Sequence, residues 1–425
     1  MPRPLWCLSL VAPLLACEQP NVPPARFDFA ITPARQWSGG TITVRSTYFR
    51  GRGSLPLVVA GADTTSLHRI DDSTVAFTLP IGPSGAVDLA LANGHGTDEL
   101  GVVDRVGRAG RSDLTPAPQV GLVATVQGGN PVFLGAHSGQ TGYDVVEVDP
   151  VTATSRLHAG LRTPGGYYGV GITYRPDRFL LRDSTDTLKV WQLWPTPQPI
   201  TVPPLFRTGH LRLGAQMTDS TWLFNQSHWT NTSGPVSLTF LPTEDAWNLF
   251  VSPRGDRVAM ALVATTLAGA PIFDTRSGDT AFTAAGIKAV QWAEFSGDGG
   301  TLYLLGAAHY QTPLADSIYI LDATTGQRLG ASDLPDSLTA LTLARDPGRD
   351  LLFVQGYRSC GPRVLVYQAS TLTLLGEMAG GGTITSCNNY TWSGVMAVDR
   401  VRQKLYLLWV GNTEPAPLWT FDLLP

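Results

Sequence analysis

The chain has 425 residues, of which 43% are hydrophobic and 15% charged, a balance typical of a folded protein and not of a disordered chain. Its 30 basic and 34 acidic residues give a formal net charge of −4, which argues against nucleic-acid binding because such binding needs a concentrated basic surface. The 45 Gly and 32 Pro, without a long stretch of helical periodicity, predict an all-β fold of short strands and tight turns.

The N-terminal segment differs from the rest of the chain. Arg3 precedes an apolar run over residues 5–15, which is too short to cross a bilayer and predicts a removable export signal. The run ends in Leu-Leu-Ala followed by Cys17, and this order resembles the lipobox of bacterial lipoproteins. The resemblance implies a signal peptide over residues 1–16, lipid on the Cys17 sulfur and amine, and a tether over residues 17–26. A plain secretory signal that happens to contain a cysteine is the alternative.

Residues 27–106 predict a small domain of two packed sheets. Alternating apolar residues in segments 73–80 and 85–96 place every second side chain on one face, as a half-buried strand requires. Gly39 and Gly40 permit a sharp approach to the strand that follows them. Together these segments resemble an IPT/TIG domain, which implies an immunoglobulin-like sandwich that serves as a spacer or interaction module.

A repeated unit then runs over residues 107–425. Each unit has an apolar second strand and a third strand that ends in Asp or a polar substitute, as in residues 316–330 (DSIYILDATTGQRLG). The pattern resembles YVTN-type and WD-type repeats and predicts a seven-bladed β-propeller. The predicted second strands are 132–134, 178–182, 222–224, 258–262, 302–305, 351–354 and 405–408, and the predicted third strands are 145–149, 188–193, 236–241, 272–274, 318–322, 364–367 and 418–422.

The last unit ends after its third strand, so its fourth strand must come from elsewhere in the chain. Exposed strand edges are a liability, and a propeller can remove one by borrowing an N-terminal strand. We predict that a segment within residues 100–115 closes the ring. This segment competes with the last strand of the sandwich, so either the two domains share it or closure is imperfect.

Connections from second to third strands and between blades open on one face of such a ring. Aromatic and amide residues gather in these predicted loops, and such side chains suit a sugar ring or a peptide. We therefore predict a recognition face, the alternative being that these residues pack the loops against each other. The residues are Tyr167, Tyr168, Trp229, Tyr310, Asn388, Asn389, Tyr390 and Trp392.

Two cysteines fall in neighbouring loops of the same face. Cys360 lies in the sixth unit and Cys387 in the connection to the seventh, and export would place both in an oxidising compartment. We predict a disulfide between them, which would fix the middle of the long loop over residues 380–394.

The sequence contains no nucleophile signature, phosphate loop or metal-ligand spacing, so we expect no metal and no cofactor. Asp149, Asp274 and Asp322, which end third strands, are predicted to cap their own turns and not to catalyse. Five other acids could still pair in space, namely Asp183, Asp186, Glu244, Asp245 and Glu294.

These observations favour a lipoprotein that binds or scaffolds through one propeller face. It would lie in the bacterial cell envelope, periplasmic or at the surface, with the membrane as one partner and a glycan or protein as another. The alternative is an extracytoplasmic hydrolase or lyase acting on polysaccharide or peptide. Acids with a His at the mouth of the central channel would favour the enzyme, whereas aromatic residues there would favour the binding protein.

Overall fold

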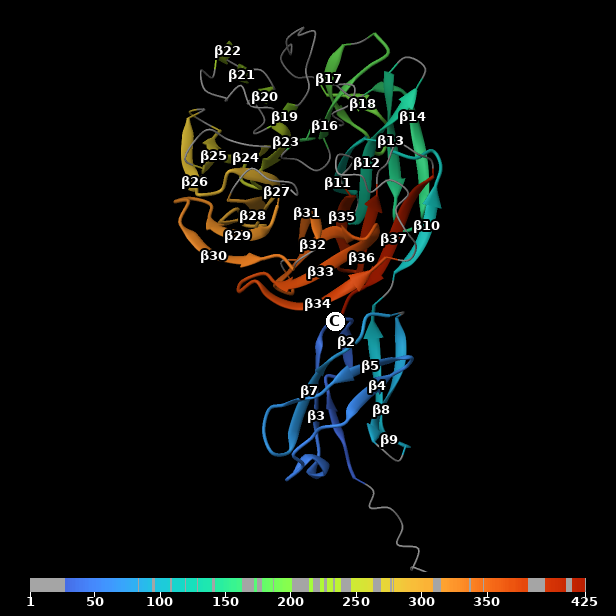
Figure 1. The fold of residues 1–425 in the computed structure, drawn as a ribbon. Coiled ribbons are helices and arrows are strands. Elements are labelled where there is room, and N and C mark those ends of the chain that lie inside the picture. The colour runs from blue at the N-terminus through green and yellow to red at the C-terminus, as the bar shows by residue number, and fades with distance from the viewer. Residues whose placement is uncertain are drawn as a thin grey trace, which may run out of the picture.

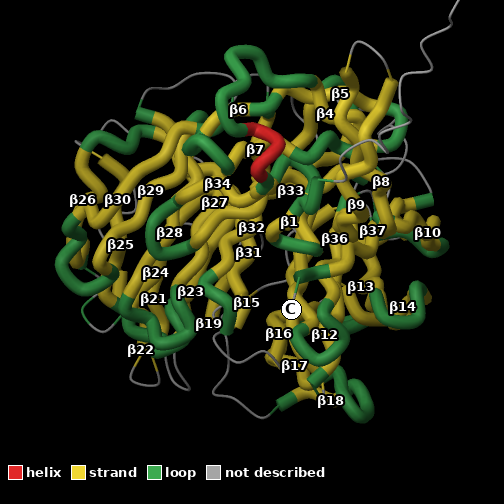
Figure 2. The backbone as a smooth tube through the Cα atoms, turned by 90° about the horizontal axis from the view of Figure 1, so that it is seen from below, coloured by secondary structure: helices red, strands yellow, loops and turns green. Residues whose placement is uncertain are grey.

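The structure is a computed structural model. It describes residues 27–425 apart from 83, 94–95, 108, 119, 128, 140–141, 163–171, 174–177, 186, 201–213, 217–221, 225–227, 232–233, 238–245, 263–268, 276, 278, 309–314, 336–337, 347, 381–393, 410–414 and 425. In this part of the chain the elements are strands and one 3-10 turn, η1 (Thr47–Phe49), which Figure 2 shows in red beside the strand labelled β7. The all-β prediction is confirmed. No helix among the described residues has the length and apolar character needed to span a membrane.

Residues up to Val106 form two sheets that pack face to face. One sheet has the order β1 (Ala30–Thr32), β3 (Thr41–Arg45), β7 (Thr74–Thr78), β6 (His68–Arg69), and the other β2 (Arg35–Trp37), β9 (Gly96–Val106), β8 (Gly85–Asn93), β4 (Leu57–Ala60), β5 (Asp63–Ser66). The alternating residues predicted to face inward do so, because Phe77 and Leu89, one from each sheet, are at most 1% exposed and share one core. Membership of the IPT/TIG family stays a prediction.

The remaining strands form a ring in which Figure 1 shows first strands near the middle and fourth strands at the rim. In the described part of the chain they make seven sets of four, here called blades one to seven. In chain order the first three are β11 (Val120–Gln127), β12 (Asn130–Gly139), β13 (Gly142–Asp149), β14 (Thr154–Arg162); β15 (Ile172–Thr173), β16 (Arg178–Arg182), β17 (Leu188–Gln192), β18 (Gln198–Pro199); and β19 (Gly214–Gln216), β20 (Trp222–Phe224), β21 (His228–Asn231), β22 (Gly234–Ser237). Blade two is irregular, because β15 pairs parallel with β19 of blade three and a single bridge joins β14 to β16.

Blades four to seven continue the order. They are β23 (Ala246–Val251), β24 (Arg257–Leu262), β25 (Gly269–Asp274), β26 (Thr280–Ala285); β27 (Ala289–Phe295), β28 (Thr301–Ala307), β29 (Ser317–Asp322), β30 (Arg328–Asp333); β31 (Thr339–Asp346), β32 (Leu351–Arg358), β33 (Gly361–Gln368), β34 (Thr373–Ala379); and β35 (Gly394–Asp399), β36 (Lys404–Trp409), β37 (Ala416–Asp422) with β10 (Gly110–Leu114). This arrangement is a β-propeller.

The N-terminal side of the chain closes the ring. β10 pairs antiparallel with β37, from Gly110 opposite Thr420 to Leu114 opposite Ala416, and supplies the fourth strand of blade seven. The strand lies inside the segment predicted for this purpose. The sandwich keeps its own last strand, since β9 ends at Val106 before β10 begins. The expected competition between the two domains therefore does not arise.

One strand of blade three lies earlier in the chain than predicted. The third strand is β21, which pairs with β20, whereas the residues placed there by the prediction begin in the fourth strand, β22. The prediction of a third strand at 236–241 was wrong. β21 has the sequence HWTN, in which polar residues outnumber apolar ones, so it lacks the hydrophobic run by which the other third strands were found.

The sandwich joins the rim of the propeller at blades six and seven (Figure 1). Trp37, at the end of β2, is 6% exposed and belongs to the core that those blades share, with Phe353 and Trp419. A Cβ added to Gly376 on β34 would lie only 2.7 Å from the Trp37 Cβ, so the close approach requires glycine there. The two units thus share a hydrophobic core.

Backbone hydrogen bonds reinforce this joint on both sides of the sandwich. The Glu377 N–H donates to the Ser38 carbonyl at 2.6 Å, and the Ala109 N–H donates to the Ala379 carbonyl at 2.9 Å. The connection between β2 and β3 and the segment that leaves the sandwich after β9 therefore both bind the outer strand β34. This covers part of an edge that would otherwise expose unpaired backbone groups.

Candidate functional site

The two faces of the ring differ in their connections. The loop face, as defined here, carries the connections from second to third strands and those between blades. The turn face carries the connections from first to second and from third to fourth strands. In an antiparallel blade successive connections alternate between the two ends of the strands, so each kind of connection lies on one face only.

Most residues predicted to form the recognition face lie outside the described residues. Trp229 is the exception, and it lies within β21, opposite Leu223 and Val236, and not in a loop. Its placement in a loop of the recognition face was wrong, because the third strand of that blade had been assigned too late in the chain. For the others the prediction stands untested: Tyr167, Tyr168, Tyr310, Asn388, Asn389, Tyr390 and Trp392.

The described part of the loop face includes the tight turn between β32 and β33. Arg358 pairs with Gly361, and the two residues between them, Ser359 and Cys360, have φ of 47° and 61°. Positive φ at both positions is the geometry of a two-residue hairpin turn. Cys360 is disulfide-bonded. Cys387 lies outside the described residues, so the pairing of these two cysteines stays a prediction.

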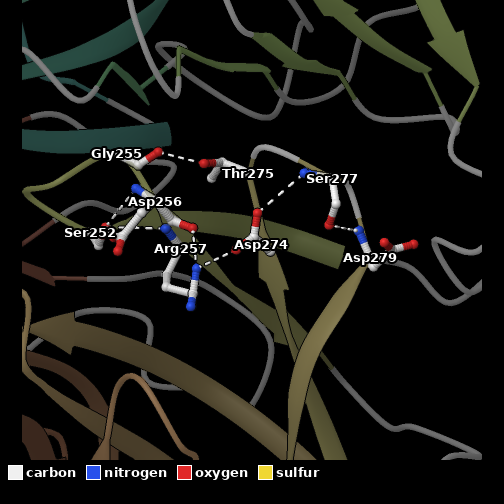
Figure 3. Close-up of polar contacts among 8 residues, drawn as sticks. All are labelled: Ser252, Gly255, Asp256, Arg257, Asp274, Thr275, Ser277 and Asp279. Atoms are coloured by element: carbon white, nitrogen blue, oxygen red, sulfur yellow. Dashed lines mark hydrogen bonds and ion pairs between the residues drawn. The ribbon is translucent and has the colours of Figure 1, made fainter.

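On the turn face the recurring acids serve the fold, as Figure 3 shows for blade four. Asp274 Oδ2 accepts a hydrogen bond from Arg257 Nη1 at 2.6 Å, and Asp274 Oδ1 accepts one from the Ser277 backbone N–H at 3.2 Å. Asp149 and Asp322 likewise accept bonds from backbone N–H groups of their own turns. The prediction that these acids cap turns is confirmed.

The first hairpin of blade four is held in a similar way. The Ser252 hydroxyl donates to Asp256 at 2.6 Å and accepts from two backbone N–H groups, while the Thr275 hydroxyl donates to the Gly255 carbonyl at 2.6 Å (Figure 3). In blade five the Ser296 hydroxyl donates to an acid in the same turn at 2.5 Å. The polar groups of these turns already hydrogen-bond to one another and to the backbone, which leaves them little capacity to bind a ligand.

The centre of the ring contains a tryptophan from blade five. Trp292 on β27 packs against three hydrophobic cores, one of blades four and five, one of blades five and six, and one of blades seven and one. A single side chain reaches cores on opposite sides of a ring only near its axis. Its ring meets that of Phe250 at a centroid distance of 4.9 Å and 63°. The Trp292 Nε1 is buried and has no hydrogen-bond partner among the residues that the structure describes.

Glu294 follows two residues later on the same strand and so projects to the same side of it. Its carboxylate makes no hydrogen bond or ion pair within the described part of the chain. Burial raises the pKa of Glu294 to about 7, and the positive charge of Arg345 offsets only part of that effect. The group is therefore largely protonated below neutral pH.

Arg345 reaches this region from β31 of blade six. Its Cζ lies 5.7 Å from the centroid of the Tyr303 ring, so its positive charge lies near that ring. In the described part of the chain the Arg345 Nε is buried without a hydrogen-bond partner. We call Trp292, Glu294, Tyr303 and Arg345 the central cluster. Tyr303 is 3% exposed, and the other three side chains are half-buried, although the Trp292 Nε1 and Arg345 Nε atoms themselves are buried.

Of the five acids considered for catalysis, the structure describes Asp183 and Glu294, and of these two Glu294 is the one without a partner among the described residues. Asp183 is held by Lys189 at 2.6 Å and by the Thr185 hydroxyl, so it is part of a turn. Asp186, Glu244 and Asp245 lie outside the described residues. No group of three potential metal ligands occurs among the residues the structure covers. Trp292 and Arg345 were not predicted, because no local pattern marks a residue at the axis of a ring.

Glu294→Gln should change how stability depends on pH. Since the pKa of Glu294 is higher in the folded state than its ordinary value of 4.5, the native protein loses stability as pH rises from about 4.5 to about 7. This loss in the free energy of unfolding is at most about 3 kcal/mol between pH 4.5 and pH 8. Glutamine does not ionise, so the variant should not show this loss. Urea unfolding at both pH values measures it.

Asp322→Asn is a control of opposite sign for the same experiment. Backbone hydrogen bonds from Thr325 and Thr324 lower the pKa of Asp322, so its contribution is present at neutral pH and lost in acid. If Glu294→Gln and the wild type lose stability in parallel between pH 4.5 and 8, the carboxyl is not buried as the structure has it.

Comparisons with known proteins bear on the fold. No protein-family model matches the chain, and no curated protein matches it either. A chain of the mitotic checkpoint complex superimposes with a TM-score of 0.50 and 12% identity, covering 75% of this chain and 93% of that chain. The fold is a β-propeller.

Two other propeller-like structures are similar to a lower degree. YCF48 bound to D1 peptide gives a TM-score of 0.48 at 12% identity, over 75% of this chain and 98% of that one. The WD40 domain of Toxoplasma gondii coronin gives 0.46 at 11% identity, over 75% and 88%. At such identities the likeness concerns the fold of the propeller alone.

Proposed function

We propose that this propeller is a binding or scaffolding module of the bacterial cell envelope, held to a membrane by lipid on Cys17. The observation that carries the proposal is the position of the sandwich. It packs against the rim through Trp37 and β34, so it covers neither the loop face nor the turn face. A propeller held by its rim offers both faces to partners.

The path of the chain fits a tether at the far end of the sandwich. Phe27, the first described residue, packs on Tyr48 with ring centroids 5.1 Å apart, and the propeller contacts the sandwich through Trp37 instead. A lipid anchor that precedes residue 27 would then lead to the end of the sandwich away from the propeller. The sandwich would act as a rigid spacer, in line with the role implied by its IPT/TIG resemblance.

The loop face is the part of the propeller that we propose to bind the ligand. The ligand would be a glycan or a protein, bound by the aromatic and amide residues predicted there, with a disulfide between Cys360 and Cys387 to stabilise the longest loop. A glycan and peptide array probed with the protein from residue 18 onward tests this. Absence of any selective binding would contradict it.

The central cluster favours binding over catalysis. Arg345 is the one charged group that acts on the Glu294 carboxyl among the described residues, whereas an acid–base pair would require a second carboxylate or a His there. A hydrolase or lyase acting on polysaccharide or peptide is the alternative that this arrangement supports less well.

Cys17→Ser should release the protein from membranes. Two or three acyl chains anchor a protein stably, and all of them depend on this cysteine in a bacterial lipoprotein. Membrane sedimentation and detergent-phase partitioning measure the change, with a loss of most of the membrane-bound fraction as the expected result. Cys7→Ser, in the apolar signal segment, is the matched control and should leave retention intact. Equal retention of both variants would rule out the lipid anchor.

A further inference from the structure

The end of the sandwich away from the propeller carries exposed apolar side chains. β3 leads away from the joint at Ser38 and ends at Arg45, which pairs with Ala30 of β1 (Figure 1). At this end Phe27 is 40% exposed and Ile70 is 59% exposed. The distal patch, as defined here, consists of Phe27, Tyr48, Arg52, Arg69 and Ile70.

Contacts join these residues into one surface. The rings of Phe27 and Tyr48 meet with centroids 5.1 Å apart, and the Arg52 Cζ lies 3.8 Å from the Tyr48 centroid. Arg69 Nη2 donates a hydrogen bond to the Arg52 carbonyl at 2.7 Å, and Ile70 is the next residue along the chain. The patch is therefore continuous from Phe27 to Ile70.

Four arginines lie in or beside the patch, namely Arg45, Arg50, Arg52 and Arg69. None of them forms an ion pair with another residue that the structure describes, because Arg52 and Arg69 donate to backbone carbonyls instead. The carboxylates at this end are fewer: Asp28, Asp71 and Asp72. A guanidinium without a carboxylate partner can bind a phosphate group, whose geometry matches its planar fork.

The patch also lies where the proposed anchor would bring the membrane. Nine residues, 18–26, separate Cys17 from Phe27. At full extension they would hold Phe27 within about 35 Å of a lipidated Cys17. A tether of this length keeps the bilayer at high effective concentration around the patch, so contacts that are weak in free solution can form.

We propose that the distal patch binds the surface of the lipid bilayer. Phe27 and Ile70 enter the interface, and the arginines contact lipid phosphate groups while their apolar stems stay beside the rings. This contact rests on the lipid anchor of the proposed function and adds an orientation to it. The propeller would stand away from the membrane by the length of the sandwich.

A tether that does not use Cys17 tests this contact by itself. A hexahistidine tag in place of residues 1–17 holds the protein on vesicles of phosphatidylethanolamine and phosphatidylglycerol that contain a nickel-chelating lipid. An environment-sensitive fluorophore is attached to Ile70→Cys, and to Val102→Cys as the matched control, because Val102 is 52% exposed on the same sandwich. The unsubstituted protein gives the background from other cysteines.

We expect spin-labelled lipid to quench the fluorophore at position 70 at least threefold more strongly than the one at position 102. Phe27→Ser should reduce the quenching at position 70 at least twofold. Leu329→Ser should leave it unchanged, because Leu329 is 57% exposed on the propeller strand β30. Urea unfolding confirms that each variant is folded. Equal quenching at both positions, or unchanged quenching in a folded Phe27→Ser, would overturn the proposal and leave a protein as the partner of this end.

The result is separate from the test of the anchor. If Cys17→Ser releases the protein from membranes but position 70 is not quenched on the tagged vesicles, the patch is refuted and the anchor stands. If position 70 is quenched but Cys17→Ser stays on membranes, the anchor is refuted and the patch is supported as a membrane-binding surface.

Discussion

Replacing Trp37 by Ala is expected to lower the free energy of unfolding of the whole chain by about 3–5 kcal/mol. The indole is buried in a core that also contains Phe353, Met378 and Trp419 of the propeller, so its removal leaves a cavity between the two units. Because the propeller loses packing as well as the sandwich, both should melt at lower temperature. Urea unfolding followed by fluorescence and by circular dichroism measures the loss.

Val102→Ala is the matched control for Trp37→Ala. Val102 lies on the sandwich strand β9 and is 52% exposed, so its truncation should change stability by no more than about 0.5 kcal/mol. An unchanged propeller transition in Trp37→Ala, with only the sandwich destabilised, would show that the shared core does not couple the two units.

Strand positions were predicted well where the determining interactions are local. Alternation along one strand identified the buried faces that contain Phe77 and Leu89, and the turn chemistry of Asp322 marked the end of β29. These signals act within a few residues, so a single sequence contains them in full. β21 escaped prediction for the same reason, since HWTN has little apolar periodicity of its own.

The centre of the ring could not be predicted from local signals. Trp292 meets the core of blades seven and one only because the ring closes, and Arg345 meets Tyr303 across the boundary between two blades. Both contacts depend on how separate units stack, which no pattern within one unit encodes. Glu294 was noted as an acid, but its lack of a partner and its desolvation appear only in the folded ring.

The same limit applies to the joint with the sandwich. Nothing in the sequence around Trp37 distinguishes an indole that belongs to the sandwich core from one that enters the propeller. The sequence around Gly376 gives no sign of the contact with Trp37 either, because the two residues lie far apart in the chain. The prediction of a spacer domain was therefore made without any indication that the spacer is rigid.

Leu114→Ala is expected to destabilise the protein by about 2–5 kcal/mol, because this residue helps to close the ring. Leu114 ends β10, is 2% exposed, and packs with Phe133 of blade one and Leu418 of blade seven. The strand is contributed by the N-terminal side of the chain, so its contacts connect the first and last blades. Weakening them should lower the midpoint of urea unfolding for the propeller as a whole.

Asp113→Ala on the same strand separates ring closure from general effects of mutation. The Asp113 side chain is 47% exposed and, among the described residues, pairs with Arg111 alone, at 2.8 Å, an exposed ion pair of the kind that contributes about 0–1 kcal/mol. The two neighbours point to opposite sides of one strand, so they share its backbone but not its core contacts. If Leu114→Ala costs no more than Asp113→Ala, the Leu114 side chain contributes little to holding the first and last blades together, and β10 must close the ring through its backbone pairing with β37.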